Sequence, residues 1–278
     1  MSCPDPSQSS DVVEESSSRS ALCLPSQPSP LVSLEPAAKL PKRFVTPGGL
    51  AKGFFREQAH IWLAPLHTRE GDAMWLGPLA VGLVVSVKKD RTISHEMSEN
   101  QDYRDFSGKV SVFGNQYTSV VVPLGMYFAG RGFKNERLRR TGLLGLAAIA
   151  HTSAVVHTLK SVTGRERPWD AERRGHFWSA GDSFPSGHSA NAWALATVIA
   201  HEYSDKKWVR WVSYGTAGAV SVSRIGHGQH FASDVLVGST LGVLIGRHLT
   251  RHADGDGRFS LEPAASSGGV GVRLNIKP

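Results

Sequence analysis

Six apolar stretches, separated by polar connections, recur from residue 75 onward. They cover residues 75–87, 117–129, 141–159, 190–200, 208–222 and 235–249. Because they mix glycine, alanine and leucine without strict alternation of apolar and polar positions, they favour helices over strands. An earlier segment, residues 54–67, spaces its apolar side chains as in an amphipathic helix, which suits a membrane surface or the protein core. The pattern predicts an all-α protein built as a helical bundle.

The lengths of these stretches leave the relation to a membrane open. Most are shorter than the roughly 20 apolar residues that span a bilayer, and the stretch 141–159 carries two histidines. They are more typical of a buried bundle than of membrane spans. Gly238, Gly242 and Gly246 recur at every fourth residue, which on a helix makes a smooth stripe that permits close packing against a neighbour.

The two ends of the chain differ in composition from the middle. Residues 1–43 are rich in serine, proline and glutamate with few large apolar groups, a composition that cannot offset the entropy cost of ordering. The chain after His252 is polar and rich in glycine, and its closing VGVRLNIKP alternates enough for a short strand. We therefore expect a disordered leader (1–43), a helical domain (44–250) and a short polar tail (251–278).

Charge and cysteine usage narrow the class of protein. The formal net charge of +7 suits a nucleic acid, an anionic membrane or a phosphorylated substrate. The basic residues are scattered through apolar segments instead of forming a basic arm with interleaved aromatics, which argues against nucleic acid. The two cysteines, Cys3 and Cys23, lie in the leader, so no disulfide framework holds the fold. The leader has no basic start followed by an apolar run, so no clear signal peptide is visible.

Three short segments concentrate residues suited to phosphate chemistry, and the first is KSVTGRERP, residues 160–168. Lys160 follows a long apolar stretch, whereas Arg167 precedes Pro168, which resists a continued helix. Lysine offers a compact charge, and the planar fork of arginine matches two oxygens of a phosphate. Taken alone, the pair is better explained as cations that compensate a helix dipole.

The second segment is SFPSGHSA, residues 183–190. Pro185 and Gly187 lead sharply into a helix that we expect to start near Ser186 to Ser189. Free backbone N–H groups, the Ser186 hydroxyl and the helix dipole together form a site for an anion. His188 stands at the mouth of that site, where a protonated imidazole can give its proton to a leaving oxygen. Without other evidence, these residues would be ordinary helix caps.

The third segment is SRIGHGQHFASD, residues 223–234. His230 and Asp234 are four residues apart, which places them on one face if the helix beginning near Ser233 includes or closely follows His230. A carboxylate that holds one ring nitrogen fixes the tautomer and leaves the lone pair of the other nitrogen free to attack phosphorus. Arg224 adds a second guanidinium for the phosphate oxygens.

Together the motifs K-x6-R-P, P-S-G-H and S-R-x5-H-x3-D, in this order and without a substitution, resemble the signature of the type 2 phosphatidic acid phosphatase and vanadium haloperoxidase superfamily. The resemblance covers about 75 residues, 160–234, and the flanking helices are similar in character to those of bacterial envelope members. It implies a helical bundle with the active site at the helix ends, and phosphatase members that need no metal or other cofactor.

The resemblance also implies a role for each matching residue. Phosphate oxygens are bound by side chains and one backbone amide, contributed by Lys160, Arg167, Arg224, Ser186 and Gly187. His230 forms a phosphohistidine that Asp234 orients, and His188 protonates the leaving group and later activates water.

These observations predict a metal-independent phosphatase acting on a phosphomonoester. The expected substrate is a lipid phosphate such as phosphatidate, an isoprenoid diphosphate or a small phosphoester, at the membrane surface of the cell envelope and with an extracytoplasmic active site. One alternative is a vanadate-dependent haloperoxidase, since vanadate adopts the geometry of the phosphoryl transition state, although known members of that kind are generally much longer. Another alternative is a non-catalytic anion-binding envelope protein, in which the complete set of acid, nucleophile and orienting residues would have no catalytic role. The sequence identifies neither the leaving group nor the oligomeric state.

Overall fold

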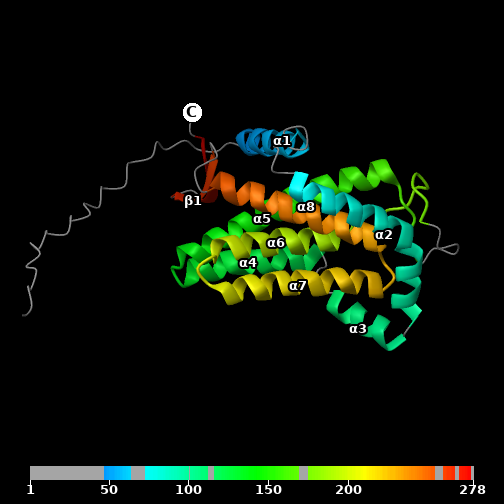
Figure 1. Cartoon of the computed structure of the whole chain (residues 1–278). Coiled ribbons are helices and arrows are strands. Elements are labelled where there is room, and N and C mark those ends of the chain that lie inside the picture. Colours follow the sequence, from blue (N-terminus) through cyan, green and yellow to red (C-terminus); the bar gives the residue numbers. More distant parts are fainter. Residues whose placement is uncertain are drawn as a thin grey trace, which may run out of the picture. The chain divides into compact units, whose positions relative to one another are not determined.

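The computed structural model describes residues 47–63, 73–99, 101–111, 116–168, 175–253, 259–266 and 269–276. The expected leader and residues 64–67 of the expected amphipathic helix lie outside these ranges. The described helices are α1 (Pro47–Leu63), α2 (Ala73–Glu99), α3 (Gln101–Ser111), α4 (Gln116–Gly132), α5 (Glu136–Thr163), α6 (Gly187–Glu202), α7 (Lys207–Gly226) and α8 (Ala232–Arg251). Each of the six apolar stretches lies within one of them, so the prediction of an all-α bundle is confirmed (Figure 1).

A two-stranded antiparallel hairpin follows the helices. Strand β1 (Phe259–Ser266) pairs with β2 (Gly269–Ile276), with Phe259 opposite Ile276 and Ser266 opposite Gly269. The alternating residues near the end of the chain therefore form β2.

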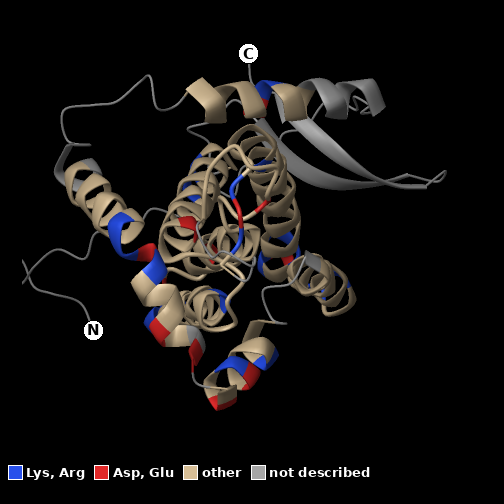
Figure 2. Cartoon of the chain, turned by 90° about the vertical axis from the view of Figure 1, so that its right-hand side faces the viewer, with Lys and Arg blue, Asp and Glu red and all other residues tan. Residues whose placement is uncertain are grey.

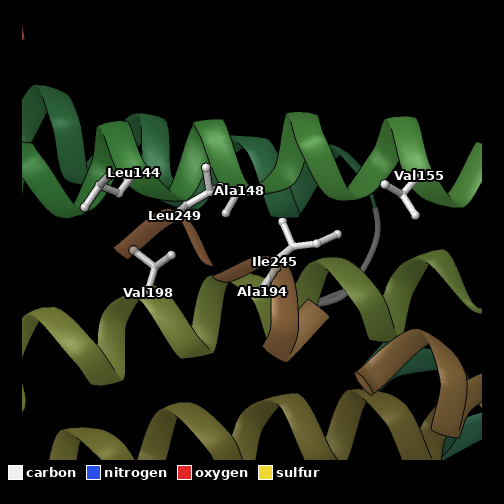
Figure 3. Close-up of a cluster of buried hydrophobic side chains, with 7 residues drawn as sticks. All are labelled: Leu144, Ala148, Val155, Ala194, Val198, Ile245 and Leu249. Carbon is white, nitrogen blue, oxygen red and sulfur yellow. The ribbon is translucent and has the colours of Figure 1, made fainter. Parts of the chain in front are cut away.

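The core lies between three long helices. Helix α5 contacts both α4 and α6, and α6 also contacts α7 and α8. Figure 3 shows the central apolar cluster, to which α5 contributes Leu144, Ala148 and Val155, α6 contributes Ala194 and Val198, and α8 contributes Ile245 and Leu249. The small alanines let the helices approach closely, and each large aliphatic side chain that is fully buried stabilises the fold by about 1.5–3 kcal/mol.

Close packing of α8 on α6 joins two of the motif segments. A Cβ atom on Gly238 would collide with the carbonyl oxygen of Ser186, and one on Gly242 would collide with that of Ala190. The glycine stripe thus allows the start of α8 to lie against the start of α6. The backbone N–H of Ser186 donates to the carbonyl oxygen of Asp234 at 3.0 Å, which ties the second motif segment to the third.

Candidate active site

The three motif segments meet at one end of the bundle. Helix α5 ends there at Thr163, and α6 and α8 begin there at Gly187 and Ala232. Gly164 ends α5 in a left-handed conformation (φ 50°), and its N–H donates to the carbonyl oxygen of Lys160 at 2.9 Å. Figure 2 looks onto this end and shows basic and acidic positions close together in the connecting loops. Two helix N-termini and the cations of the first motif therefore converge at one place.

A cavity of about 440 Å³ opens at these helix ends. Five of the predicted site residues line it: Lys160, Arg167, Gly187, His188 and His230. The other three, Ser186, Arg224 and Asp234, do not line the cavity and are at most 6% exposed. The cavity is large enough for a phosphate and for part of the group esterified to it.

His230 is held in one orientation by the backbone. Its Nδ1 lies 2.8 Å from the carbonyl oxygen of Ser183 and 3.7 Å from Oδ2 of Asp234. A carbonyl oxygen only accepts, so Nδ1 carries the hydrogen and Nε2 carries the lone pair. Burial, opposed in part by Asp234, lowers the pKa of His230 to about 4. The imidazole is therefore neutral at neutral pH, the form that a nucleophile needs.

Asp234 is fully buried and accepts hydrogen bonds on both oxygens. Its Oδ1 accepts from Arg165 at 2.5 Å, and its Oδ2 accepts from Ser183 Oγ at 2.6 Å and from the N–H of Phe231 at 2.9 Å. Burial alone would raise the pKa of Asp234, but the interactions with His230, Arg165 and Ser183 together lower it. The ionised carboxylate thus sits beside His230 and also ties the three motif segments together.

Arg165 connects Asp234 to a helix outside the motifs. Its Nη2 donates to Oδ2 of Asp90 on α2 at 2.8 Å, and its guanidinium lies over the rings of Phe177 and Phe231, with centroid distances of 4.7 and 4.4 Å. Asp90 also accepts from the N–H of Ser233 at 2.9 Å. The position of Arg165 between Lys160 and Arg167 is a hint of its role that is visible in the sequence, whereas nothing marks Asp90, which stands in the charged stretch KKDR.

We expect Asp90→Asn to lower the free energy of unfolding by about 3 kcal/mol, because breaking a buried ion pair leaves an uncompensated charge. Asparagine has the shape of aspartate but removes half of the countercharge around Arg165. Urea denaturation of the purified protein measures the effect. The matched control is Asp205→Asn, which breaks the exposed pair between Asp205 and Arg137 and should change stability far less. Equal losses in the two variants would contradict the importance of the buried pair.

The cations of the cavity already hold a carboxylate. Arg167 donates through Nε and Nη2 to the two oxygens of Asp182 at 2.6 and 2.7 Å, and Lys160 contacts the carbonyl oxygen of Asp182. Hydrogen bonding to Arg167 is the main cause that lowers the pKa of Asp182 to about 2. Arg167 thus holds two carboxylate oxygens at once, which is the bidentate geometry that a guanidinium also offers to a phosphate.

Gln229 joins Arg167 to Arg224. Its Oε1 accepts from Nη1 of Arg167 at 3.0 Å and from Nη2 of Arg224 at 3.3 Å. Burial, followed by the charge of Arg167, lowers the pKa of Arg224 to about 10, so this guanidinium stays charged at neutral pH. Its Nε is buried without a hydrogen-bond partner among the described residues. Arg224 therefore adds positive charge next to the cavity although it does not line it.

His188 lies in the first turn of α6, after the N-cap Ser186. Burial is the main cause that lowers its pKa to about 3, and the charges of Arg224, His230, Lys160 and Arg167 act in the same direction. The imidazole is therefore neutral before an anion binds, whereas the sequence suggested a protonated one. A bound phosphate dianion would offset the cations and raise the pKa again.

One wall of the cavity was not predicted from the sequence. It is formed by Ser153, Val156, His157 and Ser161 of α5 together with Asn191 of α6. Positions 153, 156, 157 and 160 share one face of a helix, so counting back from Lys160 with helical periodicity would have found most of this wall.

The fold and the site together define a helical-bundle protein with a cation-lined cavity to which all three motif segments contribute. Residues 141–256 match the family model of the PAP2 superfamily. The resemblance inferred from the three motifs is thus confirmed.

Two relatives share 34% identity with this chain over an alignment of 136 residues that covers 46% of the chain. They are a lipid A 1-phosphatase from Porphyromonas gingivalis, of which the match covers 28%, and phosphatidylglycerophosphatase B from Bacillus subtilis, of which it covers 65%. The chain thus spans less than two thirds of either relative. The crystal structure of a transmembrane PAP2-type phosphatidylglycerolphosphate phosphatase from Bacillus subtilis has a TM-score of 0.50 and 23% identity, over 73% of this chain and 95% of that one. This likeness shows a shared fold.

Proposed function

We propose that this protein is a phosphatase that hydrolyses a phosphomonoester of a membrane lipid through a phosphohistidine on His230. The observation that carries the proposal is the hydrogen bond from Nδ1 of His230 to the Ser183 carbonyl oxygen. It assigns the lone pair to Nε2 of a neutral imidazole, in a cavity that Lys160, Arg167 and His188 also line. A nucleophile, cations and a second imidazole in one cavity are the groups that phosphoryl transfer requires.

The reaction proceeds in two balanced steps. In the first, Nε2 of His230 attacks phosphorus, the ester P–O bond breaks, and His188 gives a proton to the leaving oxygen. In the second, His188 takes a proton from water, the oxygen of that water attacks phosphorus, and the P–N bond breaks to release phosphate and restore His230. Lys160, Arg167 and Arg224 stabilise the charge that develops on the phosphoryl oxygens, and each such donor contributes on the order of a hundredfold or more in rate.

Exposed apolar side chains support the proposal that the substrate is a membrane lipid. Large apolar side chains are exposed on α2, α4 and α7, including Val84, Val121, Phe128 and Trp211. Within the described residues, α5 is the one helix long and apolar enough to cross a membrane, and half of its most apolar window is buried in the protein. Both relatives are named for phosphatases of lipids, lipid A and phosphatidylglycerophosphate. We therefore place the protein at the membrane.

We further propose that the active site is extracytoplasmic, as the similarity of the flanking helices to those of bacterial envelope members of the superfamily implies.

Phosphate release by the purified chain in EDTA tests the proposal. We expect detergent-dispersed phosphatidate, phosphatidylglycerophosphate or isoprenyl diphosphate, or p-nitrophenyl phosphate, to release phosphate without added metal. If no substrate of the panel released phosphate, and wild type equalled His230→Ala throughout, the proposed activity would be wrong.

A further inference from the structure

The side chain of Gln229 lies between two of the three cations assigned to the phosphoryl oxygens. Its Oε1 accepts from Nη1 of Arg167 at 3.0 Å and from Nη2 of Arg224 at 3.3 Å. A guanidinium only donates, so the amide oxygen of Gln229, and not its amide nitrogen, faces both arginines. Burial is the main cause that lowers the pKa of Arg224 to about 10, and the charge of Arg167 adds to it. One neutral acceptor therefore joins two cations that lie close enough to repel each other.

The backbone of Gln229 is fixed by Arg224 itself. The carbonyl oxygen of Arg224 accepts from the N–H of Gln229 at 3.0 Å and from the N–H of His230 at 3.3 Å. Gly228 has a left-handed conformation (φ 70°), which turns the chain after the end of α7. Arg224 thus contacts Gln229 through both its main chain and its side chain. As a result, the turn that places His230 also places the amide of Gln229.

Each guanidinium has a further partner at a different nitrogen. Arg167 donates to Asp182 through Nε and Nη2, whereas it donates to Gln229 through Nη1. Arg224 donates to Ser111, the last residue of α3, through Nη1, whereas it donates to Gln229 through Nη2. A rigid, planar group held at two or more of its nitrogens cannot turn without breaking a hydrogen bond. Because Gln229 is the partner that the two guanidiniums share, it sets their separation.

We infer that Gln229 is a positioning residue, which holds the guanidiniums of Arg167 and Arg224 where the transition state of phosphoryl transfer needs them. The inference rests on the proposed phosphatase activity. Gln229 is not among the described residues that line the cavity, so it acts through the two arginines. An amide oxygen accepts from both cations without the negative charge of a carboxylate, which would oppose the binding of a phosphate. Displacing a catalytic group by about 1 Å can cost on the order of a hundredfold in rate.

The test compares a transition-state analogue with a ground-state ligand. Gln229→Met removes the acceptor and keeps the length of the side chain. Orthovanadate adopts the geometry of the phosphoryl transition state, whereas inorganic phosphate is the product. In chelator-free buffer with p-nitrophenyl phosphate as substrate, we expect the variant to raise the Ki of orthovanadate at least about tenfold and that of phosphate by less than about threefold. Its kcat should fall in step with the weaker binding of orthovanadate.

Gln229→Glu separates the position of the guanidiniums from their charge. The carboxylate keeps an acceptor for both arginines but adds a negative charge beside the bound anion. It should therefore weaken orthovanadate and phosphate by similar factors and raise KM more than it lowers kcat, as expected when an interaction common to ground state and transition state is lost. The ratio of the two inhibition constants should stay close to the wild-type ratio.

Gln58→Met is the matched control, because it makes the same replacement at a buried glutamine. Gln58 lies on α1, and its Nε2 donates to the carbonyl oxygen of His151 at 3.1 Å. Both inhibition constants and kcat should keep their wild-type values in this variant. Wild-type values in Gln229→Met, or an equal weakening of both ligands, would overturn the positioning role while leaving the phosphatase intact. Absence of phosphate release by wild type would overturn the activity and the inference together.

Discussion

Replacing His230 with alanine should lower kcat/KM for phosphate release by on the order of 10³-fold or more, because the variant lacks the atom that we propose attacks phosphorus. The side chain is 1% exposed, and its Nδ1 is engaged with Ser183, so Nε2 is positioned by the backbone. Water admitted into the vacated space lacks both the nucleophilicity and the fixed position of Nε2. The loss should appear in kcat with little change in KM, since His230 does not provide charge for binding the phosphate.

The measurement combines initial rates with detection of the intermediate. Wild type quenched in alkali during turnover of a 32P-labelled substrate should carry label on histidine, and His230→Ala should carry none. His227→Ala is the control, because His227 lies in the same motif segment at the end of α7 but does not line the cavity. Its activity should stay within a few-fold of wild type. Retention of more than a tenth of the wild-type activity by His230→Ala would exclude His230 as the nucleophile.

Except for α3, whose residues are mostly polar and which the apolar pattern did not predict, the helices could be predicted from the sequence because their signals are local. Apolar runs without alternation predict a helix from neighbouring residues alone. The helix ends are marked just as locally, by Gly164 after the last turn of α5 and by Ser186 before the first turn of α6. The glycine stripe of α8 also predicted close packing against another helix, and the structure identifies that helix as α6. Periodicity predicts which face of a helix is buried, but it does not identify the helix that packs against that face.

The side chains that contact the site residues could not be predicted from the sequence motifs. Asp90 contacts Arg165 across 75 positions of sequence, and no local pattern marks it. Gln229 and Asp182 were visible in the sequence, but their contacts with Arg167 depend on how the loops fold. A stretch such as KKDR is usually a solvated helix surface, so only tertiary packing distinguishes this buried carboxylate from an exposed one.

The hydrogen-bond acceptor of His230 Nδ1 was also not predicted from the sequence. The four-residue spacing led to Asp234 as the group that fixes the imidazole, and Asp234 does lie 3.7 Å from Nδ1. The nearer acceptor is the carbonyl oxygen of Ser183, at 2.8 Å. Backbone carbonyls carry no side-chain signature, so a sequence motif cannot reveal one that accepts from an imidazole. We therefore expect the Ser183 carbonyl to share with Asp234 the task of fixing the tautomer.

His188→Gln should separate the two chemical steps. Before an anion binds, burial and the neighbouring cations hold the pKa of His188 near 3, so His188 gains its proton when the phosphate dianion enters. An alkyl leaving group needs that proton, whereas p-nitrophenolate leaves without one. With p-nitrophenyl phosphate the variant should therefore still phosphorylate His230. It should then stall, because no imidazole remains to activate water for the second step.

The expected result is a burst of about one p-nitrophenol per protein, followed by turnover slowed on the order of 10²- to 10⁴-fold. With an alkyl phosphate both steps slow and no burst of the alcohol should be seen. Stopped-flow absorbance measures the burst, and the 32P label on histidine confirms that its amplitude is phosphoenzyme. His176→Gln, an exposed histidine outside the cavity lining, should behave as wild type. Slow turnover of His188→Gln on p-nitrophenyl phosphate without a burst would contradict this assignment, because an enzyme slowed only in activating water must accumulate the phosphohistidine.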